Sequence, residues 1–365
     1  MRNLSFVYQT IATLAYSNQF NWPLSFDEVY QRLISVELAK QLIAQYGGHL
    51  GRSQSLNKPK KAEQPADTSA DTSTDALAEQ PADTKVKSQL QQTLNKLLKS
   101  GIVLEQAGEF FLSSALKPQQ TLTQLITQKK KNQEFSNSLR SELMQVKQAL
   151  KKISWIRASG VTGALAVANT QADDDLDFLI ITEDNRLWLS RFRLLFYLVV
   201  TGQKPFFFSE KKDRWCFNLW LESSALSLPS AKQSIYGAYE AKQVNWFYDC
   251  QRLSQDFYQK NQWIEKYLLH KGLVGFNQEA PACDNLRKVV KKKGFSSELK
   301  DMILTKLNKL AYLIQKKHIF KKTNVARANL SLRQAFFHDD ESYKKFIQEW
   351  QRLLQLSCEK LGRII

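Results

Sequence analysis

Hydrophobic residues recur at helical spacing through most of the chain. Within residues 1–50, Tyr8, Ile11 and Ala15 fall on one face of a predicted helix. The same spacing predicts a helix over residues 88–100, an amphipathic helix over 186–200, and a long polar helix over 121–152. Residues 230–365 are expected to be helical, with helices at 302–320 and 343–361. The pattern therefore indicates a chain that is largely helical.

Short apolar segments interrupt this pattern and predict β-structure. Residues 102–105 and 110–112 flank Ala107 and Gly108, which predicts a β-hairpin. Residues 175–182 end in a β-branched, apolar run and are interpreted as a buried strand. Residues 206–208 and 214–222 predict two further strands. The expected fold class is α+β.

Local signals place two helix ends in the N-terminal part. Ser25 and Glu28 have the spacing of a capping box, in which each side chain bonds an N–H at the start of a helix. Gly101 directly follows the apolar stripe of residues 88–100 and is expected to end that helix.

The composition changes sharply over residues 51–86. Ala, Asp, Thr, Ser, Gln and Pro dominate there, and Ala-Glu-Gln-Pro-Ala-Asp-Thr occurs twice, at 62–68 and 78–84. Such a segment has little apolar surface to offset the entropy of ordering, so we predict a disordered, low-complexity insert.

The elements on both sides of this insert resemble a winged-helix domain, formed by residues 1–50 and 87–117. The resemblance places the helix over residues 88–100 where a DNA-reading helix would lie. Its outer face would carry Gln89, Gln91, Gln92, Asn95, Lys96 and Lys99. These residues suit contacts with bases or phosphates, but they are also ordinary solvent-facing helix residues, and winged helices also dock proteins. Residues 118–150 are expected to form a connector helix.

The 365 residues carry a formal net charge of +17, which favours polyanions such as nucleic acid, nucleotides or an anionic membrane surface. Four scattered cysteines and four histidines show no metal-ligand spacing, so we expect reduced thiols and no zinc site. The first residues lack the features of a signal peptide, and the most apolar stretch, residues 187–200, contains two arginines. We therefore expect a cytoplasmic protein with no membrane partner.

The densest candidate chemistry lies in residues 154–181. A small-residue turn at 159–164 is followed by an acidic cluster that leads into the predicted strand over 175–182. Because side chains alternate along a strand, Asp175 and Asp177 should share one face, about 6.5–7 Å apart along the chain. Two neighbouring carboxylates repel each other unless a cation lies between them, and Mg²⁺ prefers such oxygen ligands.

Gly163-Ala164, ten further residues, and then Asp175-Leu176-Asp177 resemble the hallmark of the nucleotidyltransferase superfamily, which has the polymerase-β-like fold. The resemblance covers about residues 154–228. It implies a mixed sheet with flanking helices over 151–230, followed by a helical C-terminal domain over 231–365. It also implies that Asp175 and Asp177 hold two Mg²⁺ ions, and that the turn holds the phosphates of an NTP. The phosphate-binding residues would be Ser159, Thr162, Gly163 and Ala164.

Two departures from the family pattern matter for the expected activity. Ala164 stands where the family usually has serine, and a third carboxylate is not evident. Asn218 and Glu222 share the parity of the strand over 214–222 and are the candidates. Asparagine is a weaker Mg²⁺ ligand than a carboxylate, however, and Glu222 lies near the strand's end. The acidic cluster could also be a solvated loop beside a tight turn at Gly163.

The resemblance implies transfer of a nucleoside monophosphate from an NTP to an acceptor. The alternative is a catalytically lapsed relative that acts as a nucleotide-sensing or nucleic-acid-binding regulator. Nucleic acid would then bind the winged helix or the basic helices of the C-terminal region. Arg191 and Arg193 could reach a triphosphate or point to solvent. The pattern indicates neither the acceptor nor the oligomeric state.

Overall fold

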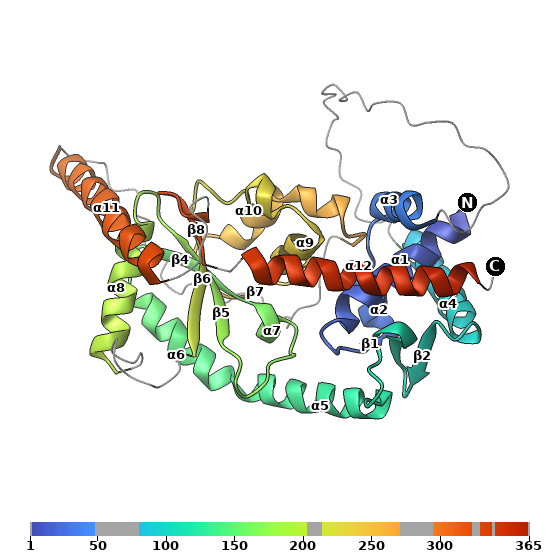
Figure 1. Ribbon diagram of the computed structural model, residues 1–365. Coiled ribbons are helices and arrows are strands. Elements are labelled where there is room, and N and C mark those ends of the chain that lie inside the picture. The colour runs from blue at the N-terminus through green and yellow to red at the C-terminus, as the bar shows by residue number, and fades with distance from the viewer. Residues whose placement is uncertain are drawn as a thin grey trace, which may run out of the picture. The chain divides into compact units, whose positions relative to one another are not determined.

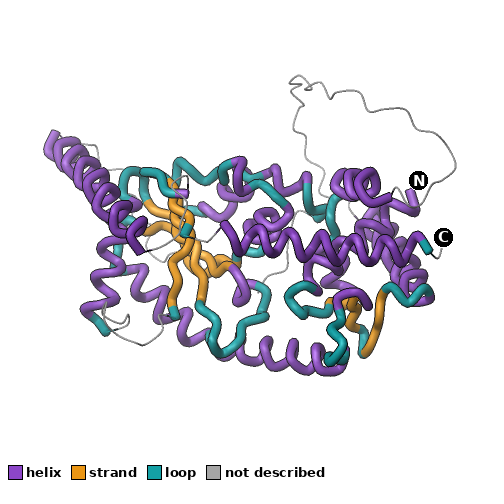
Figure 2. Tube along the Cα trace, in the orientation of Figure 1, coloured by secondary structure: helices purple, strands orange, loops and turns teal. Residues whose placement is uncertain are grey.

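The computed structural model describes residues 2–47, 80–202, 214–270, 295–322, 329–337 and 340–363 (Figure 1). The chain divides into two compact units, Met1–Thr123 with Trp350–Ile365, and Gln124–Glu349. Both combine helices and strands, so the α+β class is confirmed, and the strands of each unit form their own sheet (Figure 2). Within the described ranges, no helix has the length and apolar composition needed to cross a bilayer.

The first unit packs helices against a small antiparallel sheet. Its strands are β1 (Leu24–Ser25), β2 (Val103–Gln106) and β3 (Glu109–Leu112), in the order β1-β3-β2. The hairpin prediction is confirmed, because Ala107 and Gly108 adopt positive φ angles of 53° and 79° and join β2 to β3. The helices are α1 (Arg2–Asn18), α2 (Phe26–Arg32), α3 (Val36–Tyr46) and α4 (Gln80–Lys99).

The predicted helix ends in this unit are also observed. The Ser25 hydroxyl accepts the Glu28 N–H, and the Glu28 carboxylate accepts the Ser25 N–H, which completes the capping box at α2. Gly101 ends α4 with a φ of 65°, and the next residue, Ile102, donates its N–H to the Leu97 carbonyl. The helix α4 begins at Gln80, inside the predicted insert. Pro81 does not prevent this start, because a proline is tolerated in the first turn of a helix. Residues 51–79 lie outside the described ranges.

The second unit is built on a mixed five-stranded sheet in the order β7-β4-β5-β6-β8. Strand β4 is antiparallel to β5 and β7, β5 is parallel to β6, and β6 is antiparallel to β8. The strands are β4 (Ile156–Thr162), β5 (Leu176–Thr182), β6 (Trp215–Glu222), β7 (Asn245–Asp249) and β8 (Gln334–Phe336).

Helices α6 and α8 contribute to the main core of this unit. Val146 and Leu150 of α6 and Trp188 and Leu194 of α8 are fully buried with residues of the sheet. The α-helices of the chain from residue 122 onward are α5 (Leu122–Ser138), α6 (Arg140–Lys151), α7 (Gly163–Ala166), α8 (Leu187–Val200), α9 (Ile235–Lys242), α10 (Leu253–Lys260), α11 (Phe295–Lys322) and α12 (Asp340–Gly362). Short 3₁₀ helices are η2 (Ser113–Ala115), η3 (Ser230–Lys232) and η4 (Gln262–Lys266).

Several predicted elements differ from the observed ones. The single helix predicted over 121–152 is two helices, and the break between them lets Leu139 enter the core. The region over 231–365 is not entirely helical, because β7 and β8 join the sheet and residues up to Glu349 belong to the second compact unit. In β7 the alternating burial of Trp246 and Tyr248 explains the strand, since large aromatic residues suit a half-buried sheet surface. The strand predicted at 206–208 and the basic residues of 287–293 lie outside the described ranges.

The expectation for the cysteines needs one correction. Cys250 is disulfide-bonded, so the prediction of reduced thiols is wrong at this position. Cys216 and Cys358 are reduced thiols outside any disulfide, as expected.

A single buried amide fixes the start of α8 against α11. The Asn308 side-chain oxygen accepts the N–H groups of Trp188 at 2.9 Å and Leu189 at 3.0 Å. Replacing Asn308 with alanine should lower the free energy of unfolding by roughly 1–3 kcal/mol, because two buried N–H groups lose their acceptor. Chemical denaturation checks this. The neighbouring exposed Lys309→Ala is the matched control, and an equal loss in both variants would contradict the assigned role.

Candidate functional site

The predicted glycine turn lies beside the predicted aspartate strand. Strand β4 ends at Thr162, the chain turns at Gly163 into the single-turn helix α7, and β5 returns antiparallel to β4. The register pairs Thr162 directly with Asp177. The elbow at Gly163 and the Asp177 carboxylate are therefore brought together by the backbone pairing itself.

Gly163 is required at this elbow for two separate reasons. Its φ is 62°, in the left-handed region that residues with a Cβ rarely adopt. A Cβ built on Gly163 would also lie 2.6 Å from Oδ2 of Asp177, well inside contact distance. The carboxylate thus packs against the bare Cα of the elbow.

Side chains along β5 alternate between two faces of the sheet, one packed in the core and one that carries Asp177. Leu176, Phe178 and Ile180 belong to the main core, whereas Leu179 lines a pocket on the opposite face of the sheet. Asp177 shares the parity of Leu179 and therefore that face. Asp175 directly precedes β5, and its charge raises the pKa of Asp177. The two aspartates thus interact electrostatically, as the sequence predicts.

A third carboxylate approaches the elbow from α9, where the sequence did not predict one. The Gly163 N–H lies close enough to the Glu240 carboxylate to lower its pKa. Burial is the larger effect and raises the pKa of Glu240 to about 7. Its charge in turn raises the pKa of Asp177. Gly163 therefore packs against Asp177 with its Cα, while its N–H stabilises the charged form of Glu240.

Asp177 is the electrostatic centre of the group. Its pKa is raised to about 7, first by burial, then by Glu240 and Asp175, with a smaller contribution from Asp174. A hydrogen bond from the Asn218 amide opposes this rise. Carboxyls with pKa values near 7 are half-protonated at neutral pH, and a cation placed among them would favour the charged forms.

The two earlier candidates for a third acid have other roles. Asn218 lies on β6, donates its amide to Asp177, and accepts a hydrogen bond from the Cys216 thiol. Glu222 pairs with β5 five residues beyond Asp177, about 16 Å along the strand. Its Oε2 lies 3.7 Å from Nε of Arg333, and the backbone near the start of α8 lowers its pKa, although burial raises it overall. Glu222 therefore belongs to the far end of the sheet.

The residues predicted to hold phosphate are not all at the elbow. Thr162 and Ala164 flank Gly163, and Thr162 is buried at the end of β4. Ser159 lies three residues earlier in β4, about 10 Å from Thr162, and its buried hydroxyl has no hydrogen-bond partner among the described residues. The Gly163 N–H already interacts with the Glu240 carboxylate. Phosphate binding by this turn stays a prediction.

The two arginines of α8 serve the packing of their own helix. Arg191 donates to Gln315 of α11 at 2.6 Å and lies over the Phe337 ring. Arg193 lies over the ring of Trp155, 4.8 Å from its centroid.

The carboxylates at the elbow are the type of ligand that a hard divalent cation prefers, but they are too few to complete its coordination shell. No group of three or more Asp, Glu, His or Cys side chains within the described ranges is arranged to hold a metal ion. Mg²⁺, however, usually binds through one or two carboxylates and completes its shell with water and substrate phosphates. Asp177 with Asp175 or Glu240 provides such a partial ligand set.

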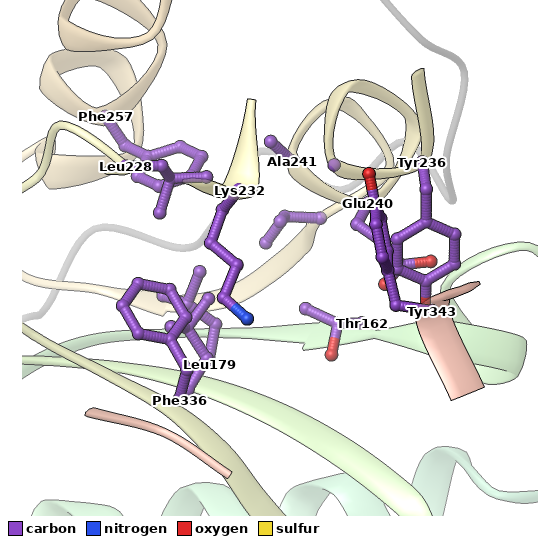
Figure 3. A pocket seen from close by; sticks show the side chains of 13 residues that line it. Thr162, Leu179, Leu228, Lys232, Tyr236, Glu240, Ala241, Phe257, Phe336 and Tyr343 are labelled. Carbon is purple, nitrogen blue, oxygen red and sulfur yellow. The ribbon is translucent and has the colours of Figure 1, made fainter. Parts of the chain in front are cut away.

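An apolar pocket adjoins this acidic group and shares residues with it (Figure 3). Its cavity volume is about 100 Å³, and Thr162 and Glu240 form part of its wall. Tyr236 and Tyr343 lie near Glu240, while Lys232 and Phe336 lie on the other side of the cavity (Figure 3). The remaining lining is aliphatic or aromatic: Leu179, Leu219, Leu228, Gly237, Ala241, Val244 and Phe257.

Sequence reasoning missed Glu240 because it sought the third acid on a strand. The available signal was local: Tyr236 and Glu240 are four residues apart on a short helix that is otherwise made mainly of apolar and small residues. Burial and the charges of Glu240 and Asp177 raise the Tyr236 pKa above its usual range. A carboxylate on such a helix must face either solvent or a polar site, and here it faces the elbow.

A scan against protein-family models, a search of curated proteins and a search of solved structures each returned no match to this chain. The nucleotidyltransferase resemblance therefore stays a prediction that depends on the residues and geometry above.

Replacing Gly163 with alanine should destabilise the protein by roughly 2–5 kcal/mol, combining left-handed strain with the clash against Asp177. Gly202→Ala is the matched control, because Gly202 also has a positive φ, of 69°, but nothing lies within 4 Å of its Cβ position. Only about 1–2 kcal/mol is expected there. Urea denaturation measures both. If Asp177→Ala does not reduce the cost of Gly163→Ala, the proposed contact is refuted.

Asp177→Asn should stabilise the metal-free protein at pH 8. The carboxyl binds its proton more tightly in the folded state, with a pKa of about 7 instead of 3.8, so its contribution to stability is lost as pH rises from about 4 to above 7. The gain should be roughly 1–4 kcal/mol at pH 8 and vanish below about pH 4. Thermal melts across this range check it. A stability gain that does not depend on pH would contradict the assignment.

Proposed function

We propose that the chain is a Mg²⁺-dependent nucleotidyltransferase that moves a nucleoside monophosphate from an NTP to an acceptor hydroxyl. One observation carries this proposal: the Asp177 carboxylate packs on the Gly163 elbow, and Glu240 meets the same elbow from α9. Burial raises the pKa of Asp177 and of Glu240, and the neighbouring acids raise that of Asp177 further. Such perturbed carboxyls cost stability, which is the usual sign of a site arranged for a cation or a proton.

Asp175 and Asp177 would hold the metal, with substrate phosphates supplying the further oxygen ligands that the described acids do not. Bound there, Mg²⁺ would polarise the α-phosphate and stabilise the charge on the departing pyrophosphate. Asn218 orients the Asp177 carboxylate by donating its amide to Oδ1. Gly163 permits the close approach of this carboxylate because it has no side chain.

Glu240 has the properties of the proton acceptor in this reaction. The acceptor oxygen would attack the α-phosphorus, the bond to the pyrophosphate oxygen would break, and the hydroxyl proton would pass to the Glu240 carboxylate. A pKa of about 7 suits a general base that works near neutral pH. Glu240 also lines the apolar pocket, so an acceptor in that pocket would lie within its reach.

The pocket suggests a class of acceptor. Its volume is about 100 Å³, and its wall is mainly aliphatic and aromatic. A dry engineered cavity of about 150 Å³ accommodates benzene. The pocket would therefore take an apolar group of at most about one ring. We infer that the acceptor is a small alcohol or phenol, or a side chain of that kind, rather than the end of a nucleic acid.

A second candidate function is a nucleic-acid-binding or nucleotide-sensing module without turnover. Asn218 of the adjacent strand β6 meets the Asp177 carboxylate as a neutral donor, which is what a lapsed metal site would show. The outer face of α4 also supports this candidate: Gln89, Gln91, Gln92, Asn95, Lys96 and Lys99 are all exposed. The strand order β1-β3-β2 behind α4 supports the predicted winged helix.

Transfer of label from α-labelled NTP in the presence of Mg²⁺ tests the favoured function. Asp177→Asn and Glu240→Gln should each lower the rate by at least about a hundredfold, because one removes a metal ligand and the other the general base. Label should appear on small phenols or alcohols and not on an oligonucleotide. Glu222→Gln is the matched control, since Glu222 is a buried carboxylate at the far end of the sheet.

Equal transfer by wild type, Asp177→Asn and Glu240→Gln would refute the favoured function. Absence of transfer, together with salt-dependent duplex binding that Lys96→Ala and Lys99→Ala weaken, would establish the second candidate instead.

A further inference from the structure

The polar face of helix α11 packs against α8 and the residue that precedes it. Asp301 forms an ion pair with Arg186, which also donates to the Thr305 hydroxyl. Asn308 accepts two N–H groups of α8, and Gln315 donates to the Trp188 carbonyl at 2.8 Å. These α11 positions recur at intervals of three, four or seven residues and therefore lie on one side of the helix.

The opposite face of α11 is mainly apolar and exposed, with Lys306 among its apolar residues. Seven large side chains form it, each between 44% and 61% exposed: Leu299, Met302, Ile303, Leu307, Leu310, Leu313 and Ile314. We call this set the outer stripe. At 3.6 residues per turn it covers an arc of about 140° and a length of about 22 Å. A soluble surface helix normally has the reverse arrangement, with its apolar stripe toward the core.

The neighbouring helix α8 also exposes apolar side chains. Phe192, Phe196 and Val200 follow each other at four-residue intervals and are 56%, 62% and 67% exposed. The first residues of α8 contact α11, and Figure 1 shows α11 projecting beyond the sheet from that meeting point. Exposed apolar surface on this scale marks an interaction site.

The charges around the outer stripe identify the kind of partner. Lys300, Lys306, Lys309 and Lys317 are exposed on α11. The acids whose side chains are described on this helix are Glu298 and Asp301, and Asp301 is already paired with Arg186. A partner that is both apolar and anionic complements this surface, whereas a second copy would bring like charges together.

We propose that the outer stripe and the exposed end of α8 bind the surface of an anionic lipid bilayer. The apolar side chains would enter the boundary between headgroups and acyl chains, and the lysines would extend to the phosphates. Two helices that meet at an angle both expose apolar residues, which suits a broad surface better than the groove filled by one partner helix. This surface contact departs from the expectation of no membrane partner, which depended on the lack of a spanning segment.

Co-sedimentation of the full chain with vesicles tests this proposal. Phosphatidylcholine vesicles that also contain phosphatidylglycerol should bind at least about tenfold more protein than pure phosphatidylcholine vesicles, and added salt should weaken the binding. The triple variant Leu310→Gln, Leu313→Gln, Ile314→Gln should lose at least about tenfold in binding. Its melting temperature should not fall, because all three side chains are exposed.

The matched control is Val36→Gln, Met144→Gln, Leu356→Gln, which removes three exposed apolar side chains elsewhere. This control should bind anionic vesicles as the wild type does. No binding by the wild type overturns the proposal, as does equal binding by both triple variants. Light scattering adds a third contrary result: a wild-type oligomer that the outer-stripe variant dissociates, without vesicle binding, assigns the stripe to a protein interface.

Discussion

The contact between the bare Cα of Gly163 and the carboxylate of Asp177 is the constraint on which the site depends. The antiparallel pairing of β4 with β5 sets these two residues side by side, and the left-handed φ of Gly163 then turns the chain into α7. The same turn directs the Gly163 N–H toward Glu240. One glycine thus determines where two carboxylates from distant parts of the chain can meet.

This arrangement costs stability at neutral pH. Burial raises the pKa of Asp177 and of Glu240 to about 7, and the charge of Glu240 raises that of Asp177 further. A fold selected only for stability would place an apolar or neutral side chain at one of these positions. The amide of Asn218 relieves part of the cost at Asp177. A bound cation would stabilise the charged forms of these carboxyls, and a carboxylate with a raised pKa accepts a proton readily. The raised pKa values therefore connect the packing of the elbow with the proposed chemistry.

Local sequence signals predicted the elements that depend on local chemistry. The capping box at Ser25 and the end of α4 at Gly101 follow from hydrogen bonds within a few residues, and both are observed. The α+β class is likewise confirmed, and the elbow and the aspartate strand lie together.

The elements that the sequence did not predict depend on contacts between distant parts of the chain. Strands β7 and β8 exist because they pair with β4 and β6, and Glu240 reaches the elbow because α9 lies on the acidic face of the sheet. The spacing of Tyr236 and Glu240 marks a polar position on α9, but no periodicity within α9 or β7 shows which face of the sheet these elements meet. The sequence also could not show that the apolar face of α11 points outward, because an apolar stripe at helical spacing does not indicate whether it faces the core or the solvent.

The central claim is that Asp177 and its neighbouring acids form a site for a divalent cation. Binding of Mn²⁺, measured by the relaxation of water protons in the presence of a non-hydrolysable NTP analogue, tests it most directly. The account predicts binding at pH 8 that falls as pH drops through about 7, because the carboxyls must lose their protons to bind metal. It also predicts that Asp177→Asn abolishes this binding. Binding that is independent of pH, or that is unchanged in Asp177→Asn, would contradict the account.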